Sequence, residues 1–186
     1  LNGVIDYGGP DLITRSRRFY SAMAPGLGGP AKVQTEERWL FDGDNPVTVS
    51  TQETSPDGRH TWHSDAAGAI TSSKMVLGAG SGNWTTRTEY PDGSSKVDTY
   101  DSALIRSSIL SGGGATISSQ EYSYDSDRRL VSVTDGRTGE TSYSYNLDDT
   151  IASITLPGNR KAQFFYDKKG QVVRTVLPDG SEQHVA

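Results

Sequence analysis

The chain has 186 residues, a formal net charge of -5 and no cysteine. The lack of cysteine excludes disulfide frameworks, cysteine-ligated zinc and thiol catalysis, and the acidic balance disfavours nucleic acid and anionic membranes as general partners. Only 33% of the residues are hydrophobic, whereas 21 glycines and 8 prolines stand among many serines, threonines and aspartates. This composition indicates short strands and frequent turns, so an all-β fold is expected.

The first 35 residues contain two Gly/Pro clusters, at 8–10 and 25–30, and no repeat can be traced in them. We therefore expect residues 1–35 to be an irregular lead-in, with a short helix or strand near residues 15–23. The chain starts with Leu1, which favours a piece of a longer protein. No apolar run reaches the roughly 18 residues of a membrane span, so none is predicted.

Residues 36–119 show widely spaced turn signals. Pro-Asp-Gly occurs at 56–58 and 91–93, and Gly/Ser-rich stretches occur at 78–82 and 111–114. In Pro-Asp-Gly, proline restricts its own φ, aspartate accepts hydrogen bonds from the backbone that follows, and glycine accepts a positive φ. We interpret this region as degenerate β-hairpin repeats with Gly/Ser-rich insertions at enlarged tips. Its predicted turn residues are Asp57, Gly58, Asp92 and Gly93.

Residues 120–186 carry a regular period of 21 residues, which separates Tyr124, Tyr145 and Tyr166. Another aromatic residue stands two positions before each tyrosine. Because residues i and i+2 point to the same side of a strand, each copy is expected to present an aromatic pair on one face of a sheet. The predicted structural aromatics are Tyr122, Tyr124, Tyr143, Tyr145, Phe164 and Tyr166.

Each tyrosine of this region is followed by a polar residue that starts a turn, and then by an apolar pair that starts the returning strand. Turns are predicted at residues 125–128, 167–170 and 178–180. The region should therefore consist of antiparallel hairpins rather than helix. The predicted turn residues are Asp125, Asp167, Gly170, Asp179 and Gly180.

The order Tyr-x-Tyr-Asp-x-x-Gly, an apolar pair and Pro-Asp-Gly resembles the YD repeat, or Rhs repeat, of bacterial Rhs proteins, toxin-complex C components and teneurins. The match is strongest over residues 120–183. The resemblance implies consecutive antiparallel hairpins of about 21 residues that form a curved ribbon or part of a shell. It brings no catalytic residue to this chain.

These observations predict a non-catalytic structural module of a larger secreted or cell-surface protein, of bacterial origin by the resemblance. The module would form part of a β-sheet shell or a self-assembling fibre. Its expected partners are the remainder of a parent polypeptide or identical copies, because an open sheet exposes unpaired backbone groups at its edge strands. No cofactor is expected.

The main alternative is a carbohydrate-binding or adhesion module in which exposed aromatic rings, Trp62 and Trp84, stack on sugars. A hydrolase is disfavoured, because no nucleophile motif occurs and most aspartates stand at turn positions. His60 and His63 lack the spacing of a metal motif, and the pairs Asp42/Asp44 and Asp148/Asp149 lack that of a calcium loop. No catalytic or metal-binding residue is predicted.

Overall fold

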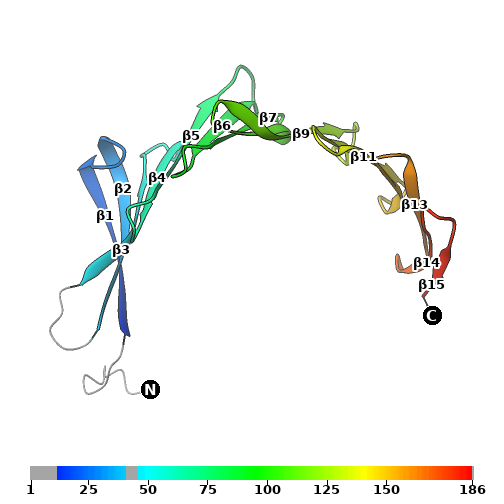
Figure 1. Cartoon of the computed structure of the whole chain (residues 1–186), viewed down its shortest axis with the longest axis horizontal. Helices are drawn as coiled ribbons and strands as arrows, with labels where there is room; N and C mark the ends of the chain where they lie inside the picture. Colours follow the sequence, from blue (N-terminus) through cyan, green and yellow to red (C-terminus); the bar gives the residue numbers. More distant parts are fainter. Residues whose placement is uncertain (1–11, 41–45, 186) are drawn as a thin grey trace. The chain divides into compact units, whose positions relative to one another are not determined.

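We describe the chain from a computed structural model, and residues 12–40 and 46–185 are the ones described. Regular structure in these residues is β-strand, and no helix there is long and apolar enough to cross a membrane. Fifteen antiparallel strands follow one another in chain order across one open sheet (Figure 1). The prediction of an all-β fold built from consecutive antiparallel hairpins is confirmed.

The chain divides into two compact units, and each is described by itself. The first comprises residues 1–79 and 84–96, and the second comprises residues 80–83 and 97–186. The predicted limits of the degenerate region at 36–119 and of the regular region at 120–186 stay predictions. The strands of the first unit are β1 (Leu12–Ala24), β2 (Gly29–Leu40), β3 (Val47–Thr54), β4 (His60–Asp65), β5 (Ile70–Leu77) and β6 (Trp84–Glu89).

Strand β7 (Ser95–Asp101) has residues in both units. The remaining strands belong to the second unit. They are β8 (Leu104–Gly112), β9 (Ala115–Tyr124), β10 (Leu130–Asp135), β11 (Gly139–Tyr145), β12 (Ile151–Leu156), β13 (Arg160–Tyr166), β14 (Val172–Val176) and β15 (Glu182–His184).

A strand does cover residues 15–23, where a short helix or strand was expected. The irregular lead-in expected around it was wrong for the described residues 12–35, while residues 1–11 lie outside the described part of the chain. Strands β1 and β2, of 13 and 12 residues, pair as a long antiparallel hairpin. Opposite charges face each other across it, as where Arg15 contacts the carboxylate of Glu37 at 2.5 Å. Such cross-strand pairs stabilise a hairpin that carries none of the repeat signals, so a search for those signals could not find it.

The tip of the β1–β2 hairpin folds back onto the sheet and creates the most buried place in the described residues. Ala24, Ala31 and Val33 are buried there, and Leu27 packs against them. The ring of Trp62 lies directly against Gly26, where an added Cβ would stand 2.1 Å from the ring. A glycine is therefore required at this point of contact.

A buried carboxylate holds the same tip in place. Glu53 on β3 is only 1% exposed, and its two carboxylate oxygens accept hydrogen bonds from the backbone N–H groups of Gly26, at 3.1 Å, and Leu27, at 2.7 Å. Burial of a charge is costly unless hydrogen bonds compensate it. The carboxylate and the two N–H groups therefore satisfy one another.

We predict that Glu53→Ala lowers the free energy of unfolding of the first unit by about 2 kcal/mol, since two buried N–H groups lose a charged acceptor. Denaturant unfolding followed by tryptophan fluorescence measures this change. Glu36→Ala is the matched control, because the Glu36 carboxylate is a third exposed and its ion pair with Arg38 should contribute less than about 1 kcal/mol. Equal losses in the two variants would contradict the role of Glu53.

In the second unit, chain segments that were predicted as hairpins are hairpins. Residues 143–156 contain the end of β11, a turn and β12, with no helix. The enlarged tip expected at 111–114 was wrong, because Gly112 pairs with Ala115 and only two residues turn the chain. These residues, Gly113 and Gly114, have φ of 60° and 80°, the conformation that a tight two-residue hairpin turn requires.

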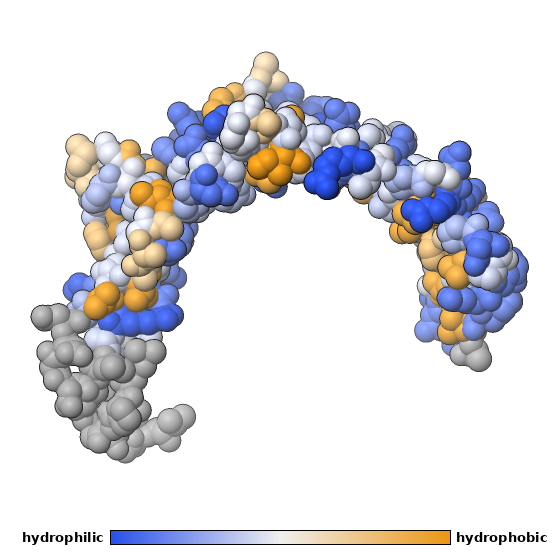
Figure 2. Space-filling view, viewed as in Figure 1, coloured by the Kyte–Doolittle hydropathy of each residue, from blue (hydrophilic) through white to orange (hydrophobic). Residues whose placement is uncertain are grey.

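Most side chains of the sheet are only partly covered. Figure 2 shows hydrophobic side chains in small separate groups among polar ones on the visible face. Large hydrophobic residues stay exposed, among them Tyr20 at 76% and Val76 at 54%. The strands are therefore held by hydrogen bonds and contacts along the sheet more than by a deep core.

Candidate functional site

The candidate site is the set of contacts that joins one hairpin repeat to the next. It begins at the turns that follow the repeat tyrosines. The N–H of Asp125 donates to the carbonyl of Arg129, and the N–H of Arg128 donates back to the carbonyl of Asp125. One carboxylate oxygen of Asp125 also accepts from the N–H groups of Asp127 and Arg129. The aspartate thus closes the loop with both its backbone and its side chain.

The same loop recurs elsewhere in the chain. Asp167 makes the equivalent backbone bonds with Gln171 and Gly170, and its side chain accepts from Lys169 and Gln171. Asp65 does so as well, with side-chain bonds from the N–H groups two and four residues further on. The repeat turn is therefore present in the first unit at a position where Ser64 replaces the tyrosine.

The Pro-Asp-Gly turns place the aspartate in the middle of the loop. At the third turn, the N–H of Leu177 donates to the carbonyl of Ser181, and Asp179 accepts from both the N–H and the hydroxyl of Ser181. Asp92 and Ser94 repeat this arrangement.

The first Pro-Asp-Gly turn differs in its partners. The carboxylate of Asp57 accepts hydrogen bonds from the hydroxyl of Ser55 and from the N–H of Arg59. The glycine of each turn has a positive φ, at Gly58, Gly93 and Gly180.

The turn after Tyr145 combines features of both kinds of turn: the backbone bonds start at Asn146, as at the turns that begin with aspartate, and the capping carboxylate stands in the middle, as in Pro-Asp-Gly. This combination was not predicted from the sequence. The carboxylate that caps the loop belongs to Asp148, which accepts from the N–H and hydroxyl of Thr150. Asp149 takes the left-handed conformation, with a φ of 66°. Asp148 and Asp149 thus serve the turn, and the sequence signal was the threonine two residues after Asp148.

A β-bulge follows the turn after each of the three repeat tyrosines. Tyr145 pairs with Ile151 but Ser144 pairs with Ser153, which leaves Ala152 as the extra residue. Val131 and Val173 are the extra residues at the equivalent places. The bulge always falls on the second member of the apolar pair that was read from the sequence.

The hydroxyl groups of two repeat tyrosines, Tyr145 and Tyr166, bind next to these bulges. The Tyr145 hydroxyl donates to the carbonyl of Leu130 at 2.7 Å, and the Tyr166 hydroxyl donates to the carbonyl of Ile151 at 2.9 Å. Each bond spans 15 residues and connects a tyrosine with the start of the returning strand in the preceding repeat. Two successive copies therefore make the same contact.

The three repeat tyrosines lie on alternate strands, β9, β11 and β13. In each strand the tyrosine and the aromatic residue two positions before it are partly buried, while the residue between them is exposed. The aromatic pair thus occupies the more covered face of its strand. Contact between the three tyrosine rings stays a prediction.

A cluster around Arg129 joins two consecutive turns. Its guanidinium contacts Asp125 at 2.8 Å and Asp149 of the next turn at 2.5 Å. It also lies 4.8 Å from the centre of the Tyr145 ring, within the range of a cation–π interaction. The cluster holds the turn of one repeat against the tyrosine and turn of the next.

Hydrogen bonds also set the charge state of the turn aspartates. The Ser94 and Ser181 hydroxyls, followed by the N–H groups of the same residues, hold the pKa of Asp92 and Asp179 below the usual range. For Asp125 the N–H of Arg129 is the main cause of a lowered pKa. Burial raises the pKa of the Tyr124 hydroxyl.

The remaining candidate residues make none of the tyrosine-to-bulge bonds. Trp62 packs on Gly26, and Trp84 is partly buried and pairs with Leu77. His60 and His63 are three residues apart on β4 and belong to opposite strand faces. Within residues 12–40 and 46–185 no group of three or more metal-ligating side chains occurs, and the Asp42/Asp44 pair lies outside these ranges.

The turns, bulges and tyrosine bonds define a class of protein built from antiparallel hairpin repeats. Residues 99–186 match the family model described as Teneurin YD-shell, a family of the YD/Rhs repeat type. The resemblance inferred from the repeat is confirmed by this match, which includes the three repeat tyrosines. No match was found among curated proteins.

We predict that Tyr145→Phe and Tyr166→Phe each lower the free energy of unfolding by about 1 kcal/mol, because a backbone carbonyl loses its hydroxyl donor while the ring is kept. Tyr143→Phe is the control. The Tyr143 hydroxyl makes none of these bonds between repeats among the described residues, so the free energy of unfolding of this variant should stay within a few tenths of a kcal/mol of the wild type. Chemical denaturation measures all three. If Tyr143→Phe lowers the free energy of unfolding as much as Tyr145→Phe does, the role assigned to the Tyr145 hydroxyl is wrong.

We also predict that acid destabilises the fold through its turns. A pKa lowered by folding means that the stabilisation is complete above the unfolded pKa of about 3.9 and is lost as the pH falls through the folded pKa. The melting temperature should therefore fall as the pH is lowered from about 5 to about 2. The double variant Asp92→Asn, Asp179→Asn should show a shallower fall. An unchanged slope would mean that these turns do not carry the effect.

Proposed function

We propose that this chain is a structural wall module, in which consecutive hairpins build a β-sheet that further strands extend at its edges. The observation that carries the proposal is the repeated bond from a tyrosine hydroxyl to the bulge of the preceding repeat, at Tyr145 and Tyr166. A contact repeated at one spacing adds a repeat without any new kind of interaction. The family match to a structural repeat family supports this function.

The sheet order indicates where the extension would occur. Strands β1 and β15 stand at the two ends of that order, and each has one neighbour among the described strands. Edge strands present backbone donors and acceptors to a further strand. We propose that this strand comes from the remainder of a parent polypeptide or from an identical copy, in a shell or a fibre.

The absence of catalysis is part of the proposal. Aspartates are the residues from which a hydrolase would draw its acid and base, but those of the turns are engaged by backbone N–H groups. A secreted or cell-surface setting, bacterial by the resemblance, also belongs to the proposal. Sugar stacking on Trp62 gains no support, since one side of its ring faces the backbone of Gly26.

The proposal is tested at β15, where the N–H of Val185 donates to the carbonyl of Val173. Because backbone groups alternate along a strand, the N–H of His184 points away from β14. His184→Pro should therefore keep the fold but remove a donor from the open edge, whereas His184→Ala keeps that donor.

We expect the sedimentation coefficient of the wild-type chain and of His184→Ala to rise with protein concentration. His184→Pro should need at least about tenfold higher concentration, equivalent to about 1.4 kcal/mol of association free energy. Thermal melting shows whether the proline variant is folded. A folded wild-type monomer at every concentration, together with hydrolytic turnover that one carboxylate substitution abolishes, would replace the structural function by an enzymatic one.

A further inference from the structure

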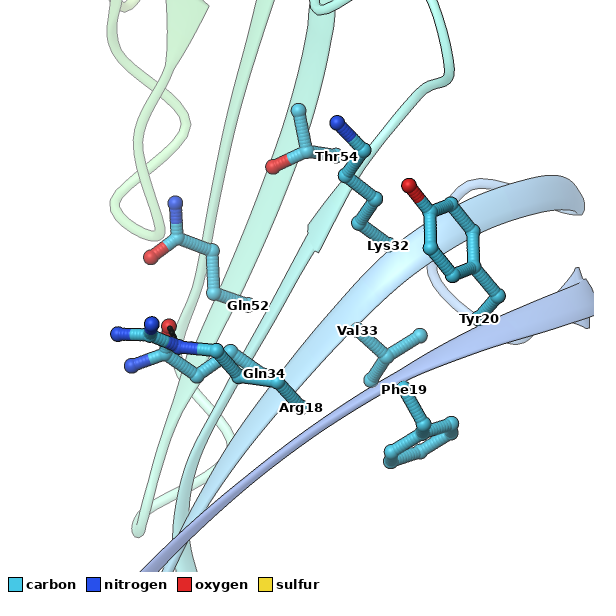
Figure 3. Close-up of a pocket in the computed structure, with 8 residues that line it drawn as sticks. All are labelled: Arg18, Phe19, Tyr20, Lys32, Val33, Gln34, Gln52 and Thr54. Carbon is cyan, nitrogen blue, oxygen red and sulfur yellow. Dashed lines mark hydrogen bonds between the residues drawn. The ribbon is translucent and has the colours of Figure 1, made fainter.

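The long hairpin of the first unit carries a groove on the face opposite to its buried tip. The groove has a volume of about 420 Å³ and is formed by β1, β2 and β3 (Figure 3). It lies outside the segment that matches the family model. Its lining residues are Arg18, Phe19, Tyr20, Lys32, Val33, Gln34, Gln52 and Thr54.

Strand register arranges six of these side chains in two rows. Arg18 pairs with Gln34, which pairs with Gln52 on the next strand. Two residues further on, Tyr20, Lys32 and Thr54 form the second row. Figure 3 shows the Tyr20 ring beside Lys32, while Phe19 points to the other side of β1.

The basic groups of the groove differ from those around it. Arg15 and Arg17 contact Glu37, and Arg38 contacts Glu36. Arg18 instead donates to the neutral amide oxygen of Gln34, at 2.9 Å. Among the described residues, its positive charge is therefore not matched by the kind of ion pair that its neighbours form.

The second row combines a cation with an open ring. Tyr20 is 76% exposed, and the Lys32 ammonium lies 6.0 Å from the centre of its ring. The exposed ring is a flat apolar surface with a hydroxyl at its edge. The lysine places a second positive charge two residues along the strands from the first row, which is roughly 7 Å by the rise of a β-strand.

We propose that this groove binds an acidic saccharide, with Arg18 and Lys32 on its carboxylate groups, Tyr20 stacked on a sugar ring, and Gln34 and Gln52 on hydroxyl groups. Arginine recognises carboxylates through paired N–H donors, and amide side chains both donate to and accept from hydroxyls. This ligand class combines the three features that the groove presents: charge, a flat apolar face and a high density of hydroxyls.

An acidic peptide would satisfy the two cations but not the rest of the groove. An extended peptide recognises a sheet through backbone bonds along an edge strand, whereas these groups project from the face of three strands. The residues of the proposed saccharide site differ from the residue at the β15 edge that tests assembly. A variant that loses saccharide binding can therefore be distinguished from a variant that loses assembly.

The test is calorimetric titration of the full chain with an oligogalacturonate, against the same oligomer after methyl esterification of its carboxylates. We expect the acid form to bind and the ester to bind at least about tenfold more weakly, which equals about 1.4 kcal/mol. Arg18→Gln and Tyr20→Ala should each weaken binding of the acid form by about tenfold or more. Arg17→Gln is the matched control, since it removes one positive charge from the same strand outside the groove lining.

Several outcomes would overturn the proposal. These are equal binding of ester and acid, an equal loss in Arg17→Gln and Arg18→Gln, and no binding of the acid form by a wild-type chain with a normal thermal melt. Tighter binding of a glutamate oligopeptide of equal charge would assign the groove to acidic peptides instead. Sedimentation of Arg18→Gln as for the wild type separates these results from a failure of edge-to-edge assembly.

Discussion

The scarcity of buried hydrophobic side chains is the constraint on which the rest of this structure depends. Ala24, Ala31 and Val33 are the buried hydrophobic residues among those described. A hairpin of two short strands is not stable alone, so each must be held by its neighbours. Backbone hydrogen bonds between strands stabilise each hairpin against its neighbours, and polar side-chain contacts between repeats add to this stabilisation. The bonds of Tyr145 and Tyr166 are the clearest instances.

One loop geometry serves turns that look different in sequence. In one form the aspartate opens the loop, as at Asp125 and Asp167, and in the other it stands in the middle, as at Asp92 and Asp179. Both place a carboxylate on the N–H groups that the turn leaves without a strand partner. Asp148 shows that one repeat can use the second form in place of the first. The repeat can therefore drift in sequence while the loop is kept.

In the first unit, the buried tip and the open groove lie on opposite faces of the same strands. On one face Val33 and Glu53 belong to the buried tip, and Glu53 bonds to it directly. On the other face Lys32 and Thr54, one residue away along β2 and β3, line the open groove. Because successive residues of a strand alternate between faces, the groove can change its side chains while the tip keeps its contacts.

The sequence by itself determined the all-β class, the hairpins of the C-terminal region and the family resemblance, because turn chemistry and a 21-residue spacing are local signals. Only the tertiary structure decided the partners of side chains far apart in sequence. Strands β1 and β2 pair through contacts such as that of Arg15 with Glu37, 22 residues away, and Trp62 is placed on Gly26. The bond of Tyr145 to Leu130 lies next to a bulge in the neighbouring strand β10, and strand register is a property of the folded sheet that spacing alone does not contain.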